Sequence, residues 1–125
     1  MEESKKSGAS EKKETAPQAK RLMIFFPPSM KPRREEKINV KALTDDNLVD
    51  TTRDDQVELS INPECRVYFK NGEKTLKIQL VKGEADVEIL TGDRMEVATF
   101  KATWISGKSP LQLFLTNMFI GGFAI

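Results

Sequence analysis

The residues best able to do chemistry in this sequence are five aspartates in the segment 44–55. Calcium binds six to eight oxygen ligands, and aspartates clustered in one loop can supply several of them. The spacing differs from an EF-hand loop, because no glycine occupies the sixth position and no glutamate the twelfth. We interpret the segment as a solvated, turn-rich loop and keep the aspartates only as a secondary calcium candidate. They are Asp45, Asp46, Asp50, Asp54 and Asp55.

The other residues include few of the groups that enzymes use as bases, nucleophiles or metal ligands. Histidine, the usual general base and a common metal ligand, is absent. The single cysteine, Cys65, has neither a base nor a second cysteine beside it, so we expect a buried structural thiol, with an intermolecular disulfide as the open alternative. The tripeptide 107–109 copies the end of a phosphate-binding loop, but Ala102 stands where that loop needs glycine. We predict no enzyme and no cofactor.

The charge balance argues against a nucleic-acid partner. Twenty Lys and Arg residues face 19 Asp and Glu residues, which gives a net charge of +1. The most basic stretch, residues 31–37, is interrupted by Glu35 and Glu36, and the chain has one Tyr and one Trp for bases to stack on. We expect this stretch to be a solvated linker.

The central part of the sequence has the two-residue period of β-strands. Apolar and polar residues alternate in short runs, and turn residues such as Asn71-Gly72 separate them. This pattern predicts an antiparallel sandwich of two sheets, or a small barrel, over residues 21–109. The expected strands lie in residues 22–26, 37–43, 56–61, 66–69, 76–80, 84–89 and 97–104.

The two ends of the sequence differ from this body. Residues 1–20 contain no Leu, Ile, Val or aromatic residue, so we predict a disordered charged tail, which also has no apolar core of a signal peptide. Residues 110–125 contain no charge and form an apolar segment that is short for a transmembrane helix. We expect 111–115 to start a last strand and 118–125 to be covered by a partner or a membrane. The predicted interaction residues are Leu111, Leu113, Leu115, Met118, Phe119, Ile120, Phe123 and Ile125.

Residues 37–104 resemble a bacterial immunoglobulin-like repeat of the invasin and intimin type. The segment 38–60, INVKALTDDNLVDTTRDDQVELS, matches its first strand, acidic loop and V-x-L strand. Phe69 next to the Asn71-Gly72 turn, the step LVKGEADVEI at 80–89 and the strand KATW at 101–104 complete the resemblance. The family often has glycine in the first acidic turn, where this sequence has Asp46. The resemblance implies an immunoglobulin-like antiparallel β-sandwich that serves as a spacer or adhesion module outside the cytoplasm.

These observations lead to three hypotheses about function. The first is a non-enzymatic structural, adhesion or assembly module that acts through protein contact and self-associates, for example in a homopolymer or surface filament. The second is a membrane-associated subunit whose carboxy-terminal segment enters the bilayer. The third is a cytoplasmic binding domain with a charged tether. A fold resemblance alone does not choose among them.

Overall fold

The computed structural model describes residues 17–121, and these residues form an all-β structure without a helix. The all-β prediction is therefore confirmed. Alternating apolar residues form strands because successive side chains of a strand point to opposite faces, so one face can be buried. The strands in this range are β1 (Arg21–Phe25), β2 (Glu35–Leu43), β3 (Gln56–Ile61), β4 (Tyr68–Phe69), β5 (Thr75–Gln79), β6 (Glu84–Leu90), β7 (Glu96–Ser106) and β8 (Phe114–Ile120).

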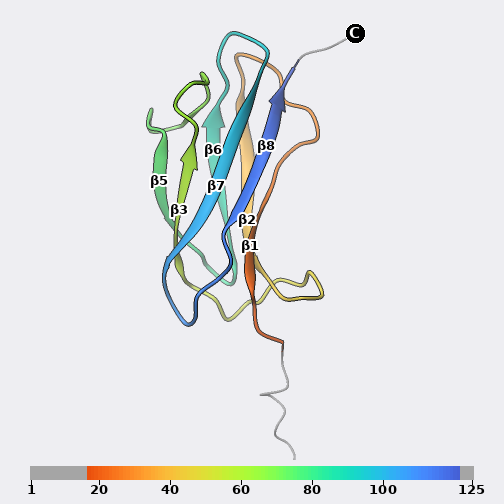
Figure 1. Ribbon diagram of the computed structural model, residues 1–125, viewed down its shortest axis with the longest axis vertical. Coiled ribbons are helices and arrows are strands. Elements are labelled where there is room, and N and C mark those ends of the chain that lie inside the picture. Colours follow the sequence, from red (N-terminus) through yellow and green to blue (C-terminus); the bar gives the residue numbers. More distant parts are fainter. Residues whose placement is uncertain (1–16, 122–125) are drawn as a thin grey trace, which may run out of the picture.

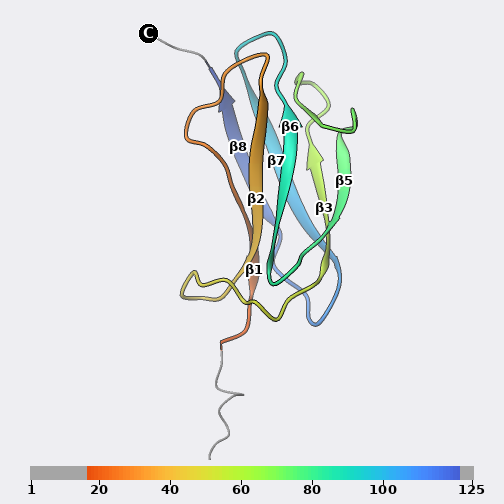
Figure 2. The same cartoon turned by 180° about the vertical axis from the view of Figure 1, so that it is seen from behind.

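The strands form two four-stranded antiparallel sheets. Sheet A has the order β1-β2-β6-β4, and sheet B has the order β5-β3-β7-β8. Sheet B is nearer the viewer in Figure 1, and sheet A is nearer in Figure 2, which shows the molecule from behind. The predicted two-sheet architecture is thus present, and the carboxy-terminal segment is the edge strand of sheet B.

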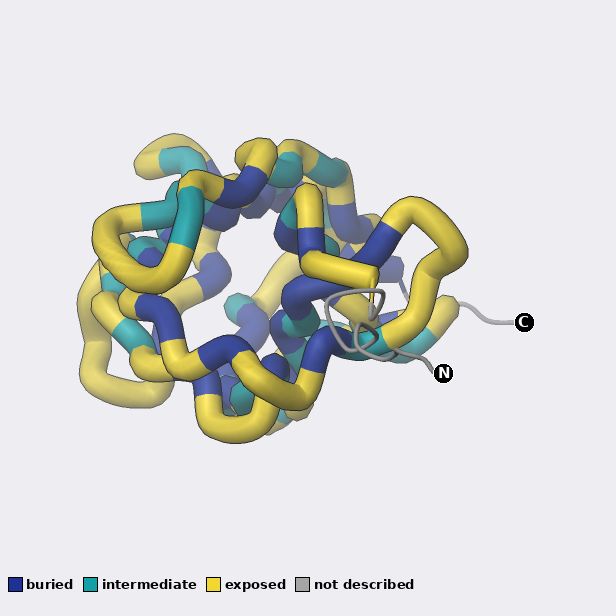
Figure 3. Tube along the Cα trace, turned by 90° about the horizontal axis from the view of Figure 1, so that it is seen from below, coloured by how far each residue is buried: buried dark blue, intermediate teal, exposed yellow. Residues whose placement is uncertain are grey.

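The core lies between the sheets and is built from the inward side chains of both. Figure 3 shows the alternation of buried and exposed residues along the chain. Phe69 of sheet A and Phe100 of sheet B are fully buried, and their rings meet edge to face with centroids 6.3 Å apart. Phe100 alternates with the polar residues Thr99 and Lys101 in β7, and this alternation places its side chain on the buried face. Such aromatic contacts across two sheets help to fix how the sheets pack.

The chain around β1 closes one side of the sandwich. The backbone N–H of Leu22 donates to the carbonyl of Gln112, and the N–H of Gln112 donates to the carbonyl of Lys20, both at 2.9 Å. Further along, the N–H of Gly121 donates to the carbonyl of Met30 at 2.8 Å. Segments at the start of the described residues therefore flank β8 near both of its ends. Covering an edge strand in this way protects it from pairing with another sheet.

The predicted boundary of the charged tail at residue 20 is wrong. Ala19 is buried, and its backbone N–H donates to the carboxylate of Asp50 at 3.0 Å. The N–H of Lys20 donates to the carbonyl of Leu43 at 2.8 Å. These contacts make residues 19 and 20 part of the sandwich, while residues 1–16 of the predicted tail lie outside the described residues.

The Asn71-Gly72 turn has a different role from the one expected. A two-residue hairpin of this type joins neighbouring strands of one sheet and has positive φ at both central residues. Here Gly72 has φ +85°, whereas Asn71 is not among the residues with positive φ. The turn follows β4 of sheet A and leads into β5 of sheet B. It therefore carries the chain from one sheet to the other.

Candidate functional site

The outer face of β8 holds the exposed part of the predicted interaction segment. Leu115 and Phe119 are 60% and 66% exposed, and Leu113, just before the strand, is 52% exposed. Val97 of β7, which lies opposite Phe119 in the register, is also exposed. These four side chains lie along the β8 edge of sheet B, with the exposed Asn117 between Leu115 and Phe119, and we call the four of them the β8 stripe.

The inner face of β8 corrects part of the sequence prediction. Met118 and Ile120 were expected to be covered by a partner or a membrane, but both are fully buried in the chain's own core. Leu111 is buried as well. The reason is the register of β7 and β8, which places Met118 opposite the buried Ala98. Phe123 and Ile125 lie outside the described residues.

The outer face of sheet A differs from the β8 stripe because charges of opposite sign are paired across it. Lys41 forms an ion pair with Glu84 at 3.0 Å. Lys70 reaches Glu88 at 2.9 Å and Glu35 at 3.2 Å. The hydrogen bond from Lys70 is the largest cause that lowers the pKa of Glu88 below its ordinary value. The hydrogen bond from Lys41 does the same for the pKa of Glu84. Strands of sheet A also carry the exposed side chains of Phe25, Tyr68 and Leu90, but each is less exposed than Leu115 or Phe119.

The acidic loop does not bring its aspartates together as a metal site. Among the described residues, no group of three or more His, Cys, Asp or Glu side chains is placed to hold a metal ion. Asp45, Asp46 and Asp54 are exposed, whereas Asp50 and Asp55 are buried. Asp50 accepts hydrogen bonds from the backbone and hydroxyl of Thr52, at 3.0 and 2.6 Å, which closes a local turn.

Asp55 belongs to a buried polar cluster that the sequence analysis missed. Arg53 donates from Nε and Nη2 to the two carboxylate oxygens of Asp55, at 2.9 and 2.8 Å, and neither side chain has exposed surface. The indole N–H of Trp104 donates to the same carboxylate at 2.7 Å. Nη1 of Arg53 donates to the hydroxyl of Ser109 at 2.9 Å. The only sequence signal for this cluster was the Arg-x-Asp spacing next to β3. That signal is weak, because charged residues in loops are usually solvated.

The electrostatics of this cluster favour an ionised Asp55. Burial by itself raises the pKa of the Asp55 carboxyl. The hydrogen bonds from Arg53 and Trp104 and the charge of Arg53 lower this pKa by more than burial raises it, so the pKa lies below its ordinary value. The pKa of Asp50 is also lowered, because its hydrogen bonds to Thr52 and Ala19 outweigh its burial. Both carboxylates therefore act as fixed structural acceptors.

The tripeptide 107–109 is part of the same cluster and is not a phosphate loop. Gly107 has φ +150°, and a Cβ there would lie 2.2 Å from an oxygen of Asp55. Ser109 is the hydroxyl partner of Arg53. The amine of Lys108 donates to the hydroxyl of Thr52 at 2.7 Å. No helix follows within the described residues, so the helix N-terminus that a phosphate site needs is missing there.

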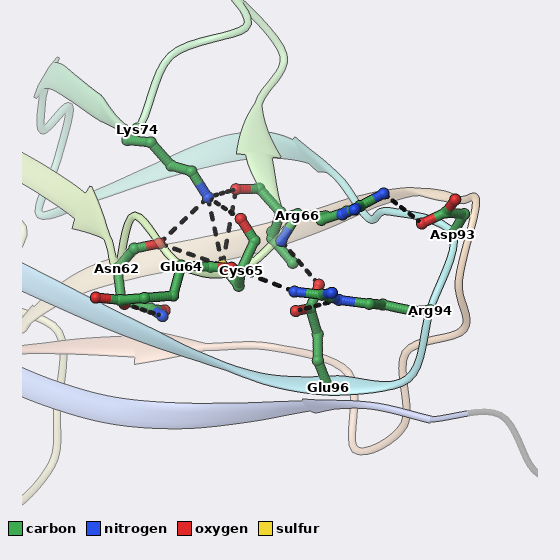
Figure 4. Close-up of polar contacts among 9 residues, drawn as sticks. Asn62, Glu64, Cys65, Arg66, Lys74, Asp93, Arg94 and Glu96 are labelled. Carbon is green, nitrogen blue, oxygen red and sulfur yellow. Dashed lines mark hydrogen bonds and ion pairs between the residues drawn. The ribbon is translucent and has the colours of Figure 1, made fainter.

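A second polar cluster lies at the other end of the sandwich, where the loop 62–67 meets the turn between β6 and β7 (Figure 4). Arg66 pairs with Asp93 at 3.3 Å, and Arg94 pairs with Glu96 at 3.1 Å. The backbone N–H of Arg66 also donates to the Glu96 carboxylate at 2.8 Å. The two loops pack so closely that a side chain larger than glycine does not fit at position 92, because its Cβ would lie 2.4 Å from Cβ of Arg66. These contacts hold the two loops against each other.

Cys65 is buried in this loop, as predicted for a structural thiol. Its Sγ lies 3.3 Å from the carbonyl oxygen of Asn62 and 3.4 Å from Nζ of Lys74. No second cysteine exists in the chain, and no histidine can act as its base. The thiol is therefore shielded by the loop.

A recess of about 430 Å³ opens between β5 and β6, where β4 is too short to continue sheet A. Leu76, Ile78 and Val87 supply its apolar lining, and the Lys70–Glu88 ion pair stands at its rim. Lys70 and Glu88 are engaged with each other, and Lys37 and Asp86 are the other charged residues of the lining.

The fold defines a two-sheet all-β sandwich protein. Among the described residues, no helix has the length and apolarity that a bilayer crossing requires. The chain matches no family model and no curated protein.

Solved structures that share the fold include two bacterial enzymes. A glycosyl hydrolase family 2 member from Bacteroides cellulosilyticus superposes with a TM-score of 0.67 at 8% identity, over 84% of this chain and 14% of its own. A β-glucuronidase from Parabacteroides merdae gives a TM-score of 0.58 at 9% identity, over 94% of this chain and 13% of its own. The chain thus corresponds to a small part of each protein, and this likeness shows the fold alone.

Proposed function

We propose that this chain is a non-enzymatic, immunoglobulin-like β-sandwich module that works through protein–protein contact, with copies of the chain associating through the β8 stripe. The strand order supports the immunoglobulin-like assignment. Such sandwiches have one sheet ordered A-B-E-D and another containing C-F-G. Naming β1, β2, β4 and β6 as A, B, D and E, and β3, β7 and β8 as C, F and G, reproduces both orders, with β5 as an extra strand beside C.

The contrast between the two outer faces carries the proposal for contact. Sheet A's outer face is crossed by ion pairs, whereas the β8 stripe leaves Leu113, Leu115, Phe119 and Val97 in water. Exposed apolar residues that lie together on an otherwise soluble protein indicate an interaction site. The distant neighbours are much longer chains, which agrees with this fold serving as an accessory module.

Light scattering over a range of concentrations tests the proposal on the full chain. We expect concentration-dependent self-association that Phe119→Lys or Leu115→Lys abolishes, because a lysine in place of an apolar side chain would have to lose its hydration in the contact. The matched control is Phe25→Lys, which changes an exposed phenylalanine on sheet A and should leave association unchanged.

Two results would contradict the proposal. One is a wild-type chain that stays monomeric at all concentrations, and the other is a loss of association in the Phe25 control equal to that in the Phe119 variant. If the chain is monomeric, flotation with liposomes tests the membrane hypothesis. Flotation of the wild-type monomer, together with no flotation of its Phe119→Lys variant, would support that hypothesis instead.

A further inference from the structure

We infer that the loop 62–67 forms a binding site for a primary ammonium group, that Lys74 occupies this site from within the chain, and that its occupancy keeps Cys65 inaccessible. This inference concerns the loop end of the sandwich and is independent of the proposed contact through the β8 stripe.

The geometry around Nζ of Lys74 is that of an ammonium site. Three backbone carbonyl oxygens surround it, those of Cys65 at 2.6 Å, Val67 at 2.8 Å and Asn62 at 3.2 Å. An ammonium group has three N–H donors and no acceptor, so three carbonyls match its donors one to one. A neutral amine would bring only two N–H donors to the three carbonyls.

The remaining contacts are also typical of cation recognition. The Nζ atom lies 4.2 Å from the centroid of the Tyr68 ring, within the distance of a cation–π interaction. Sγ of Cys65, a weak acceptor, lies 3.4 Å away. In Figure 4 the side chain of Lys74, the residue just before β5, extends to Asn62 and Cys65. One side chain therefore links two positions of the loop.

The site depends on Lys74 because the loop has few other sources of donors for these carbonyls. Carbonyl oxygens that converge repel one another through their partial charges unless a cation lies between them. With Lys74 removed, we expect the loop to open locally. Cys65, which is only 4% exposed, then becomes the natural reporter, since it is the single thiol of the chain.

The experiment measures the rate at which the full chain reacts with a thiol reagent such as a disulfide dye or a maleimide. Lys74→Met keeps most of the apolar stem and removes the charge, and Lys74→Ala removes both. We expect each variant to react roughly tenfold faster or more, since losing even one hydrogen bond from a charged group shifts an equilibrium by about that factor. Lys70→Ala, which removes an exposed lysine of sheet A's rim, is the control and should react at the wild-type rate.

Added ligand then tests the site itself. The atoms missing from Lys74→Ala correspond to n-propylammonium, which should slow the thiol reaction back toward the wild-type rate in a saturable manner. n-Propanol has the stem without the charge, and tetramethylammonium has the charge without N–H donors, so neither should protect.

Several results would overturn the inference. They are an unchanged thiol rate in Lys74→Met, protection by n-propanol equal to that by n-propylammonium, or protection by tetramethylammonium. Circular dichroism spectra of each variant separate loop opening from global unfolding, and Lys74→Met is the decisive variant if Lys74→Ala fails to fold. None of these results depends on whether the chain self-associates.

Discussion

Arg53 and Asp55 form a two-pronged ion pair in which neither side chain touches solvent. The two residues are two positions apart in the sequence, and their side chains meet at the end of the sandwich where β3 begins. Through Ser109 and Trp104 the pair also joins the turn after β7 to the acidic loop. A buried pair of this kind is satisfied only while all of its partners are present.

Removing one member of this pair should be strongly destabilising. We expect Arg53→Met to lower the free energy of unfolding by about 3–5 kcal/mol, because Asp55 is left as a buried charge without its partner. The double variant Arg53→Met, Asp55→Leu should recover part of that loss, since the uncompensated charge is gone. Urea denaturation measures both. A single variant as stable as the wild type would show that the pair contributes little to folding.

The lowered pKa values of Asp50 and Asp55 predict a loss of stability in acid. A carboxyl group whose folded pKa is lowered contributes stability above its unfolded pKa of about 3.9, and loses it as the pH falls through the folded value. We therefore expect the unfolding free energy to decrease steadily as the pH is lowered below about 4.

Asp50→Asn checks which group is responsible. The free-energy difference between this variant and the wild type should be largest near neutral pH and should shrink as the pH falls, because the wild-type Asp50 then loses its charge as well. The control is Asp45→Asn, an exposed aspartate that should change stability by no more than about 0.5 kcal/mol. A difference for Asp50→Asn that stays constant with pH would contradict the assignment.

Two glycines with the same backbone conformation should respond differently to alanine. Gly72 and Gly83 have φ values of +85° and +86°. At Gly72 an added Cβ meets nothing within 4 Å, so we expect a loss of about 1–2 kcal/mol from the left-handed conformation alone. At Gly83 the Cβ would lie 2.4 Å from the backbone oxygen of Asp50, so Gly83→Ala should be clearly more destabilising. Equal melting temperatures for the two variants would refute this contrast.

Neighbouring residues of β8 should differ in the same way. Met118→Ala should lower the unfolding free energy by about 2–5 kcal/mol, because it empties a fully buried position. Phe119→Ala, one residue further along, should change it by about 0.5 kcal/mol or less, because that side chain is largely exposed. A chain that ends after residue 109 should not fold, since β8 supplies Met118 and Ile120 to the core. A folded, soluble product of that truncation would contradict the placement of β8.

Local sequence patterns were enough to predict the positions of β1 to β7, because a strand buried on one face needs apolar residues at every second position. The run 56–61 became β3 with the same bounds, and Phe100 points into the core as its parity required. The parity of Leu111, Leu113 and Leu115, continued beyond residue 115, would have placed Met118 and Ile120 on the opposite face, whereas the structure buries those two and exposes Leu113 and Leu115. The sequence analysis did not extend the alternation that far, because both faces of 118–125 carry apolar residues.

The polar clusters were beyond local reasoning. Lys74 and Cys65 are nine positions apart, and Trp104 and Asp55 are 49 positions apart, so only the packing of the two sheets brings them together. Nothing in the composition of the acidic loop distinguishes Asp55, which is buried, from Asp54, which is exposed.

By itself the sequence determined that the body of this protein is made of strands, since this follows from the spacing of apolar and polar residues. The tertiary structure alone decided which strands are neighbours, which apolar residues of the carboxy-terminal segment are covered, and which charges are buried. Those outcomes depend on contacts between residues far apart in the chain, where the free energy of burial is shared among side chains that no local pattern relates.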